Sequence, residues 1–401
     1  MRFPYAHASH ADWSQALTLC LAQLDAQAKL EGCVREPNLG FAYLTDPLQP
    51  HAEAIVARLK SHTGIANWIG ASGVGICATG TEYPEGPALA VMLGRFDPGS
   101  FSVFSGVRRP PALGTRTASG ASAAYTALVH ADPYTPELPE LIVDMAGKVE
   151  TSYLFGGLAS GESSCTLIAD RALQGGLSGV VFAGDVGLVS RVSQGCPPFG
   201  AGHAVTRAQD NVIFELDGGR ALDVLLDDAG IRERVRSGGP GESRSALQAL
   251  ARRGLFVGIS PLEAGAYRER TPASDYVIRH VVALDPGEGA VAIAAPIEDG
   301  ARIAFCTRDE AAARKDLVRI CTQIREHLDE CGAARRAPVE AKGAVYVSCV
   351  GRGRHLFGAQ SEELQIIRHQ IGDVPLVGFY ANGEIGGQNL YGFTGVLTVF
   401  Y

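Results

Sequence analysis

The chain has 401 residues, of which 46% are hydrophobic and 19% charged, and its formal net charge is −8. This length predicts two domains, and the composition is that of a globular protein. Because the chain is acidic and its Lys and Arg residues are scattered, nucleic acid and an anionic membrane surface are poor candidates for partners.

The cysteines and the N-terminal residues indicate in which cellular compartment the protein is expected. No two of the nine cysteines have the C-x-x-C spacing of a zinc or thioredoxin-like site. An odd number of cysteines in a chain of this size favours reduced thiols, as in the cytoplasm. Residues 1–10 lack the apolar core of a signal peptide, and no apolar run reaches the roughly 18 residues that span a bilayer. We therefore expect a cytoplasmic protein without a metal site.

A helix and a strand–helix–strand unit open the chain. Apolar residues at helical spacing predict a helix over 11–30. Alternating and continuous apolar runs, with a glycine cluster between them, predict the elements that follow: a strand at 39–45, a helix at 51–59, a strand at 66–70, a glycine loop at 70–75 and a strand at 88–93.

The same order of elements occurs twice more. The second copy is predicted as strand 124–130, helix 136–147, strand 152–156, glycine loop 156–162 and strand 177–183. The third copy lies between Val345 and the C-terminus, where the second glycine loop starts near Gly378. The spacing is similar each time, from Leu44 to Gly70, from Val129 to Gly156 and from Val350 to Gly378. A period of this length is too long for a solenoid and favours duplicated α/β units.

Residues 186–203 are the predicted domain boundary, because a strand there ends in a turn-forming segment with two prolines. We predict an N-terminal domain of residues 1–200 and a C-terminal domain of residues 201–401. The second domain continues with these predicted elements: strand 211–216, helices 220–229 and 244–253, strands 254–259 and 276–284, a hairpin of 288–296 with 301–306, and a long helix at 308–331. The predicted fold class is α/β, with two related domains of mixed, mostly antiparallel sheets and outer helices in αββα layers.

The third copy carries the most specific sequence motifs. It reads Cys349-Val350-Gly351-Arg352-Gly353, then Val374-Pro375-Leu376-Val377-Gly378-Phe379, then Asn382-Gly383-Glu384-Ile385-Gly386. In the N-terminal half, Tyr153-Leu154-Phe155-Gly156-Gly157 and Arg191-Val192-Ser193-Gln194-Gly195-Cys196 stand at strand ends. With these motifs the chain resembles the FIST family, which pairs an N-terminal and a C-terminal FIST domain, over roughly residues 10–401.

The resemblance implies a sensory role. Bacterial members of the family look like intracellular sensors of small ligands, proposed to include amino acids, and some resemble haem-binding nitric-oxide sensors that act on a separate histidine kinase. Eukaryotic members join the domain pair to an F-box, but residues 1–35 are too short and too polar for one. We also expect no fused kinase or cyclase, so that a signal would pass to a separate protein. We expect a bacterial signal-transduction protein and not an enzyme, since no G-x-S-x-G or H-E-x-x-H motif is present.

Four residues of the third copy are the predicted ligand-binding set: Cys349, Arg352, Asn382 and Glu384. Arg352 suits a carboxylate, and Glu384 suits an amine, so the two together would hold a zwitterion such as an amino acid. The alternative is an ion pair between Arg352 and Glu384 that joins the two glycine loops. Cys349 is either a ligand-contacting thiol or a small buried hydrophobe, and Asn382 is either a ligand contact or a turn residue. No catalytic residue is predicted.

Two other functions stay open. A haem sensor needs an axial ligand, for which His203, His130 and Cys196 are candidates, with His203 after the Pro-Pro turn taken as the cofactor-binding residue. A protein-partner module without a small ligand would expose a flat apolar patch instead of a pocket. In the sensor hypothesis, ligand binding changes the loops at 108–121 or 238–245 and so alters a partner surface.

Overall fold

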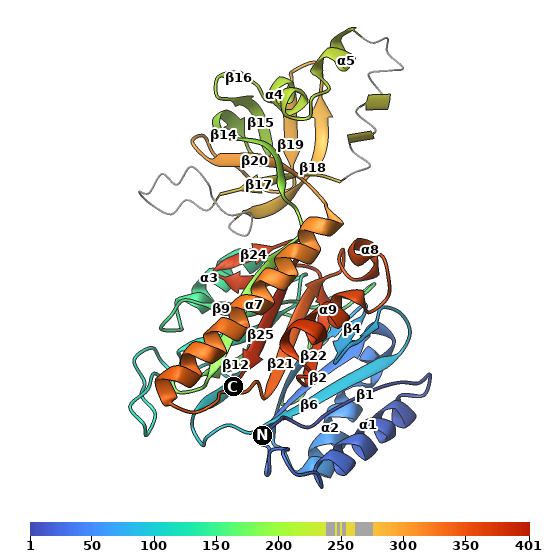
Figure 1. Ribbon diagram of the computed structural model, residues 1–401, viewed down its shortest axis with the longest axis vertical. Helices are drawn as coiled ribbons and strands as arrows, with labels where there is room; N and C mark the ends of the chain where they lie inside the picture. The colour runs from blue at the N-terminus through green and yellow to red at the C-terminus, as the bar shows by residue number, and fades with distance from the viewer. Residues whose placement is uncertain (238–244, 247–248, 251–253, 261–275) are drawn as a thin grey trace. The chain divides into compact units, whose positions relative to one another are not determined.

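The computed structural model describes residues 1–237, 245–246, 249–250, 254–260 and 276–401. The chain forms two units, one of residues 1–193 with 314–401 and the other of residues 194–313 (Figure 1). These units differ from the predicted halves 1–200 and 201–401, because the C-terminal 88 residues join the N-terminal unit. Most of the predicted loop 238–245 and of the predicted helix 244–253 lies outside the described residues.

Three six-stranded sheets make up the first unit. The first sheet has the order β1(Tyr5–Ser9), β6(Ala88–Gly94), β2(Leu39–Thr45), β3(Asn67–Gly73), β10(Leu167–Ala169), β11(Ala172–Leu173). The second has the order β24(Asn389–Tyr391), β23(Glu384–Gly387), β9(Leu154–Leu158), β8(Thr126–Ala131), β12(Leu177–Phe182), β7(Phe101–Phe104). The third has the order β13(Leu188–Gln194), β25(Thr394–Phe400), β21(Gly343–Cys349), β22(Leu376–Ala381), β4(Ile76–Ala78), β5(Thr81–Tyr83).

The structure confirms the three predicted copies. In each sheet two neighbouring parallel strands, β2–β3, β8–β9 or β21–β22, are flanked by an antiparallel strand, β6, β12 or β25. The helix that joins each parallel pair is α2(Ala52–Thr63), α3(Leu138–Ala146) or α9(Glu362–Ile371). A short 3-10 helix η1(Asp46–His51) precedes α2, and α8(Arg354–Phe357) precedes α9. The predicted loop 108–121 is confirmed as irregular chain between β7 and β8.

Each copy gives a hairpin to another copy. The chain leaves β3 of the first sheet and forms hairpin β4–β5 at the edge of the third sheet, beside β22. It leaves β9 of the second sheet and forms hairpin β10–β11 beside β3 of the first. It leaves β22 of the third sheet and forms hairpin β23–β24 beside β9 of the second. Because this exchange is cyclic, each sheet contains a hairpin from one other copy, and the three sheets are all complete only when the three copies are present.

The predicted glycine loops are wrong at the residues where they were expected to start, because Gly70, Gly156 and Gly378 lie inside β3, β9 and β22. A Cβ atom at Gly378 would lie 1.7 Å from the carbonyl oxygen of Tyr346 on the neighbouring parallel strand. Gly70 and Gly156 face the neighbouring strand in the same way, at 1.7 and 2.0 Å. The glycines therefore permit a close approach of two backbones within the sheet, not a turn.

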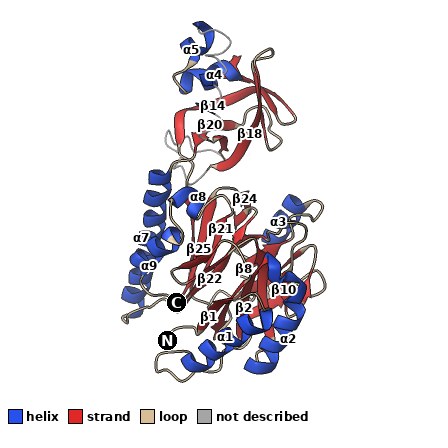
Figure 2. Cartoon of the chain, turned by 90° about the vertical axis from the view of Figure 1, so that its right-hand side faces the viewer, coloured by secondary structure: helices blue, strands red, loops and turns tan. Residues whose placement is uncertain are grey.

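The inner faces of the three sheets share one apolar core that includes Phe41, Phe155, Phe182, Phe379 and Phe400. Helices cover the outer faces, as predicted (Figure 2). α1(Trp13–Gln27) and α2 pack on the first sheet, and α3 packs on the second. α7(Glu310–Arg335) and α9 lie over the third (Figures 1 and 2). Three sheets, each with a helix layer outside it, thus enclose the core.

The second unit is a mostly antiparallel barrel around its own apolar core. Its sheet has the order β14(Pro198–Gln209), β20(Arg302–Thr307), β17(Leu255–Ile259), β18(Val277–Asp285), β19(Ala290–Ile293), β15(Val212–Leu216), β16(Gly219–Arg220), and a β14–β15 pairing closes it. Two short helices, α4(Ala221–Asp228) and α5(Arg232–Ser237), belong to it. The predicted hairpin of 288–296 with 301–306 is wrong, since β19 and β20 are not paired with each other.

No helix among the described residues is long and apolar enough to cross a membrane.

Candidate functional site

Three of the four predicted ligand-binding residues come together in the first unit. Cys349 ends β21, Arg352 lies in the turn that follows, and Glu384 begins the exchanged strand β23. Cys349, Arg352 and Glu384 lie close enough together to affect one another's ionisation. Asn382 is exposed, and its backbone N–H donates to the carbonyl oxygen of Leu158 at 3.1 Å. Asn382 is thus a turn residue outside this cluster.

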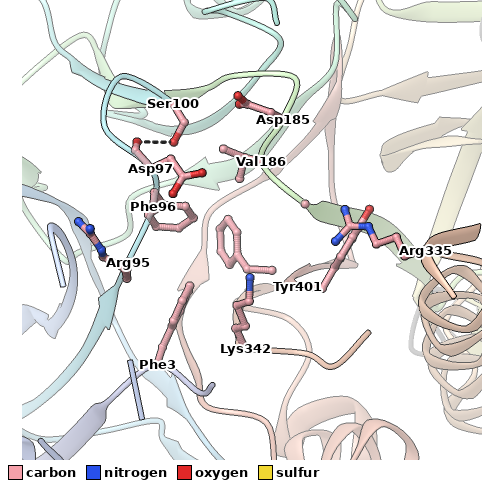
Figure 3. Close-up of a pocket in the computed structure, with 12 residues that line it drawn as sticks. Phe3, Arg95, Phe96, Asp97, Ser100, Asp185, Val186, Arg335, Lys342 and Tyr401 are labelled. Atoms are coloured by element: carbon pink, nitrogen blue, oxygen red, sulfur yellow. Dashed lines mark hydrogen bonds between the residues drawn. The ribbon is translucent and has the colours of Figure 1, made fainter. Parts of the chain in front are cut away.

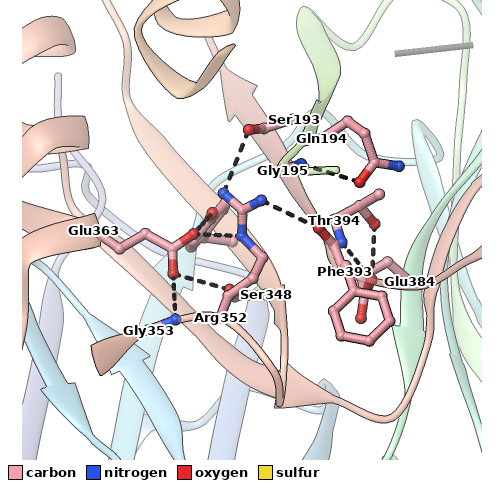
Figure 4. Close-up of polar contacts among 11 residues, drawn as sticks. Ser193, Gln194, Gly195, Ser348, Arg352, Gly353, Glu363, Glu384, Phe393 and Thr394 are labelled. Carbon is pink, nitrogen blue, oxygen red and sulfur yellow. Dashed lines mark hydrogen bonds and ion pairs between the residues drawn. The ribbon is translucent and has the colours of Figure 1, made fainter. Parts of the chain in front are cut away.

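Arg352 does not pair with Glu384, as one sequence hypothesis had it, but with Glu363 of α9. The side chains of Arg352 and Glu363 are buried, and Nε of Arg352 donates to the carboxylate at 2.7 Å (Figure 4). The other guanidinium nitrogens donate to the hydroxyl oxygen of Ser193 and the carbonyl oxygen of Phe393, both at 3.3 Å. Its guanidinium is therefore fully engaged within the protein.

Sequence reasoning missed Glu363, whose carboxylate is the centre of this polar cluster. Besides Arg352, it accepts hydrogen bonds from the hydroxyls of Tyr346 at 2.5 Å and Ser348 at 3.1 Å and from the backbone N–H of Gly353 at 3.1 Å. Its position in the first turn of α9 resembles that of an ordinary helix-start acid, so the sequence contains no signal for its burial. Four donors satisfy a buried carboxylate, which marks Glu363 as a framework residue.

Glu384 is a buried acid with one unsatisfied oxygen. Its Oε2 accepts hydrogen bonds from the backbone N–H of Thr394 at 3.1 Å and from the Thr394 hydroxyl at 2.7 Å, while Oε1 has no partner. Burial raises the pKa of Glu384 to about 8, so that the group is protonated at neutral pH. Burial, followed by the neighbouring Glu384, also raises the pKa of the Cys349 thiol. Cys349 is therefore a thiol and not a thiolate at neutral pH, as suits a buried residue.

His203, the predicted haem ligand, lies on β14 of the second unit. Its Nδ1 is 2.7 Å from Oδ2 of Asp217, and its Nε2 is 3.0 Å from Oδ2 of Asp228. Because both ring nitrogens are held by carboxylates, iron could be bound only if one of these contacts broke. Among the described residues, no group of His, Cys, Asp and Glu has the geometry of a metal site.

The first unit contains a cavity of about 150 Å³ that sequence reasoning did not find (Figure 3). It lies where β6, β12 and β25, the equivalent strands of the three copies, come to their ends. Its lining comes from separate segments of the chain: Phe3, Arg95, Phe96, Asp97, Ser100, Asp185, Val186, Gly187, Arg335, Lys342, Phe400 and Tyr401. No local motif joins these segments, which is why the sequence did not reveal the cavity.

The cavity carries more positive than negative side chains. Arg95, Arg335 and Lys342 stand against two carboxylates, Asp97 and Asp185. The Asp185 carboxylate already accepts a hydrogen bond from Ser119 at 2.5 Å. Within the described part of the chain, none of the three cations has a carboxylate partner; the Arg335 guanidinium lies 5.8 Å from the ring centre of Tyr401. Free cations beside phenyl rings suit a small organic anion.

Comparisons with known proteins agree with the sequence motifs. A FIST N domain model matches residues 38–219, and a FIST C domain model matches residues 221–387. An uncharacterised protein of Mycobacterium tuberculosis is 34% identical over 388 residues, which cover 94% of this chain and 95% of that protein. An uncharacterised protein of Mycobacterium bovis is 35% identical over 277 residues, 67% of this chain and 66% of that protein.

Proposed function

The chain belongs to the FIST family, and from this premise we propose that it is a sensory protein that binds a small carboxylate, such as an amino acid, in the cavity of the first unit. FIST domains are associated with signal-transduction sensing. In this proposal the protein acts in the cytoplasm, and the bound state is recognised by a separate signalling protein such as a histidine kinase.

The observation that carries the proposal is the surplus of unpaired cations in the cavity. Guanidinium and ammonium groups form strong charge-assisted hydrogen bonds with carboxylates. The cavity offers Arg95, Arg335 and Lys342 for this purpose, and none of them has a competing acidic partner within the described part of the chain. Asp97 is available for the amine of a zwitterion. The volume of about 150 Å³ favours a ligand of a few heavy atoms over a nucleotide.

In this proposal the predicted residues Arg352 and Glu384 do not touch the ligand, since neither lines the cavity. The guanidinium of Arg352 already has three partners, and Glu384 is uncharged at neutral pH because burial raises its pKa to about 8. A zwitterion would therefore meet neither a free cation nor a carboxylate at these two residues.

Isothermal titration of the full chain with the common amino acids and small mono- and dicarboxylates tests the proposal. We expect one class to bind, and we expect Arg95→Ala and Lys342→Ala each to weaken binding by about tenfold or more, the effect of losing one charge-assisted hydrogen bond. Arg58→Ala is the matched control, since Arg58 is exposed on α2 and does not line the cavity. Equal affinities in the natural protein and the three variants, or no binding of any of the compounds, would contradict the proposal.

A further inference from the structure

A cysteine and a histidine lie next to each other near the C-terminal end of α7. Cys331 follows His327 by four residues, so both side chains project from the same face of the helix. The Cys331 sulfur is 3.6 Å from Nε2 of His327 and 3.6 Å from the hydroxyl oxygen of Tyr401. The Tyr401 hydroxyl is in turn 3.0 Å from the same Nε2. The three polar atoms therefore form a closed triangle.

The triangle places an imidazole and a phenol directly beside the Cys331 thiol. Burial and the nearby Arg191 lower the pKa of His327, so the imidazole is neutral at pH 7 and one ring nitrogen can accept a hydrogen bond from the thiol. Burial and the hydrogen bond with Cys331 raise the pKa of Tyr401 to about 12, so the phenol stays a hydrogen-bond donor. Arg335 adds a second positive charge beside the Tyr401 ring. A base within reach and nearby cations are the conditions that activate cysteine thiols.

Cys331 also differs from the other cysteines in accessibility. Seven of the nine are buried, and only Cys331 and Cys33 are partly exposed. Cys33 lies in the loop before β2 and, unlike Cys331, has no histidine or tyrosine bonded to its thiol in the structure as described. Cys33 is therefore an internal control for Cys331: both thiols are accessible, but only that of Cys331 lies beside a base.

We propose that Cys331 is a reactive thiol that undergoes thiol–disulfide exchange with small disulfides, with His327 as the base and Tyr401 as the donor that holds the thiolate. His327 takes the proton from the Cys331 thiol. The thiolate then attacks one sulfur of a disulfide R–S–S–R, the S–S bond of the reagent breaks, and a bond between Cys331 and S–R forms. The leaving thiolate R–S⁻ takes the proton back from the His327 imidazolium. The disulfide itself is the oxidant, so the exchange is balanced.

Tyr401 links this thiol to the cavity. Its side chain bonds His327 and Cys331, and the same residue lines the cavity together with Arg335. Its backbone N–H donates to the carbonyl oxygen of Gly187, another lining residue, at 3.0 Å. A group attached to Cys331 would displace the Tyr401 hydroxyl and so disturb one wall of the cavity. The consequence for ligand binding rests on the proposed function, whereas the reactivity of the thiol does not.

Limited alkylation with iodoacetamide, followed by peptide mass spectrometry, tests the reactivity. At pH 7 we expect Cys331 to react roughly tenfold faster than Cys33, since an ordinary thiol is only a few per cent ionised at this pH. We expect His327→Gln to bring the rate at Cys331 down to that at Cys33 while the rate at Cys33 stays constant. Equal rates at the two cysteines of the natural protein, or no effect of His327→Gln, would overturn the proposal.

Two measurements distinguish a specific loss of reactivity from unfolding of the His327→Gln variant. Alkylation of the buried Cys20 in His327→Gln would reveal unfolding. The pH profile of the natural protein needs no variant: the rate at Cys331 should rise at lower pH than the rate at Cys33, and coincident profiles would again overturn the proposal.

The link to the cavity has its own test. After reaction with glutathione disulfide, which should modify Cys331, we expect faster hydrogen exchange at residues 185–187 and at the amide of Tyr401, and weaker binding of whatever carboxylate the titrations identify. Unchanged exchange at these amides would overturn the link but leave the reactive thiol in place. If no carboxylate binds at all, the proposed function fails, while the alkylation and exchange results still decide the present proposal.

Discussion

Replacement of Glu363 by Gln should destabilise the first unit strongly, because it leaves the buried charge of Arg352 without a partner. The side chains of Arg352 and Glu363 are 0% and 1% exposed. Removing one member of such a pair costs about 3–5 kcal/mol. The amide of Gln could keep one acceptor oxygen for Nε of Arg352, but its NH₂ group would then face the N–H of Gly353, which now donates to the carboxylate. Two donors would then meet in the interior.

The neighbouring acid gives a matched control. Glu362 also pairs with an arginine, Arg314, but these two side chains are 38% and 33% exposed. We expect Glu362→Gln to cost no more than about 1 kcal/mol, as is usual for exposed pairs. Urea unfolding can be followed by tryptophan fluorescence, which reports on the first unit because both tryptophans, Trp13 and Trp68, belong to it. If both variants lost the same stability, the burial argument for Glu363 would be refuted.

Two further changes test the strand packing and the buried acid. Gly378→Ala should lower the free energy of unfolding in urea by about 3 kcal/mol, because its Cβ would lie 1.7 Å from the Tyr346 carbonyl oxygen. Gly106→Ala is the control: its Cβ would meet no atom within 4 Å, so the free energy of unfolding should change by no more than about 0.5 kcal/mol. Similar losses at the two positions would contradict the close approach at Gly378. Glu384 has a pKa of about 8 in the folded protein, above its unfolded value, so the folded state holds the extra proton and stability falls as pH rises from about 5 to 8. The stability of Glu384→Gln does not depend on this proton. The free energy of unfolding of the variant, minus that of the natural protein, should therefore rise by about 1.4 kcal/mol per pH unit from pH 5 to 8. A difference that stays constant with pH would mean that Glu384 is ionised in the folded protein.

The third copy differs from the other two in chemistry, although all three share one architecture. Tyr346 occupies the position that Ala42 and Val129 hold in the first and second copies. In each copy this residue lies opposite a glycine of the neighbouring parallel strand. The outer faces of the first two sheets are packed with apolar side chains, whereas the third has the buried pair of Arg352 and Glu363. Since a buried ion pair seldom stabilises more than apolar packing would, the fold alone does not require this pair.

By itself the sequence determined the local elements and the threefold repetition. The copies that contain Gly70, Gly156 and Gly378 were visible because the apolar periodicity of strands and helices is a short-range property. The sequence alone predicts loops at the same glycines, because glycine is typical of turns. Their position inside strands depends on the neighbouring backbone, which lies at least 25 residues away in the chain and leaves no local pattern.

Only the tertiary structure decided the partners of the charged residues and the location of the cavity. From the sequence, Arg352 and Glu384 lie on neighbouring glycine segments and either hold a zwitterion together or pair with each other, but in the fold the buried Arg352 pairs with Glu363 of α9. The cavity lies where chain segments from opposite ends of the sequence meet, as Phe3 and Tyr401 do, and the triangle at Cys331 joins α7 to the last residue of the chain. The cyclic exchange of hairpins is also a tertiary property: backbone hydrogen bonds, which almost any residue can form, hold each exchanged strand, so the sequence carries no pattern from which the exchange can be predicted.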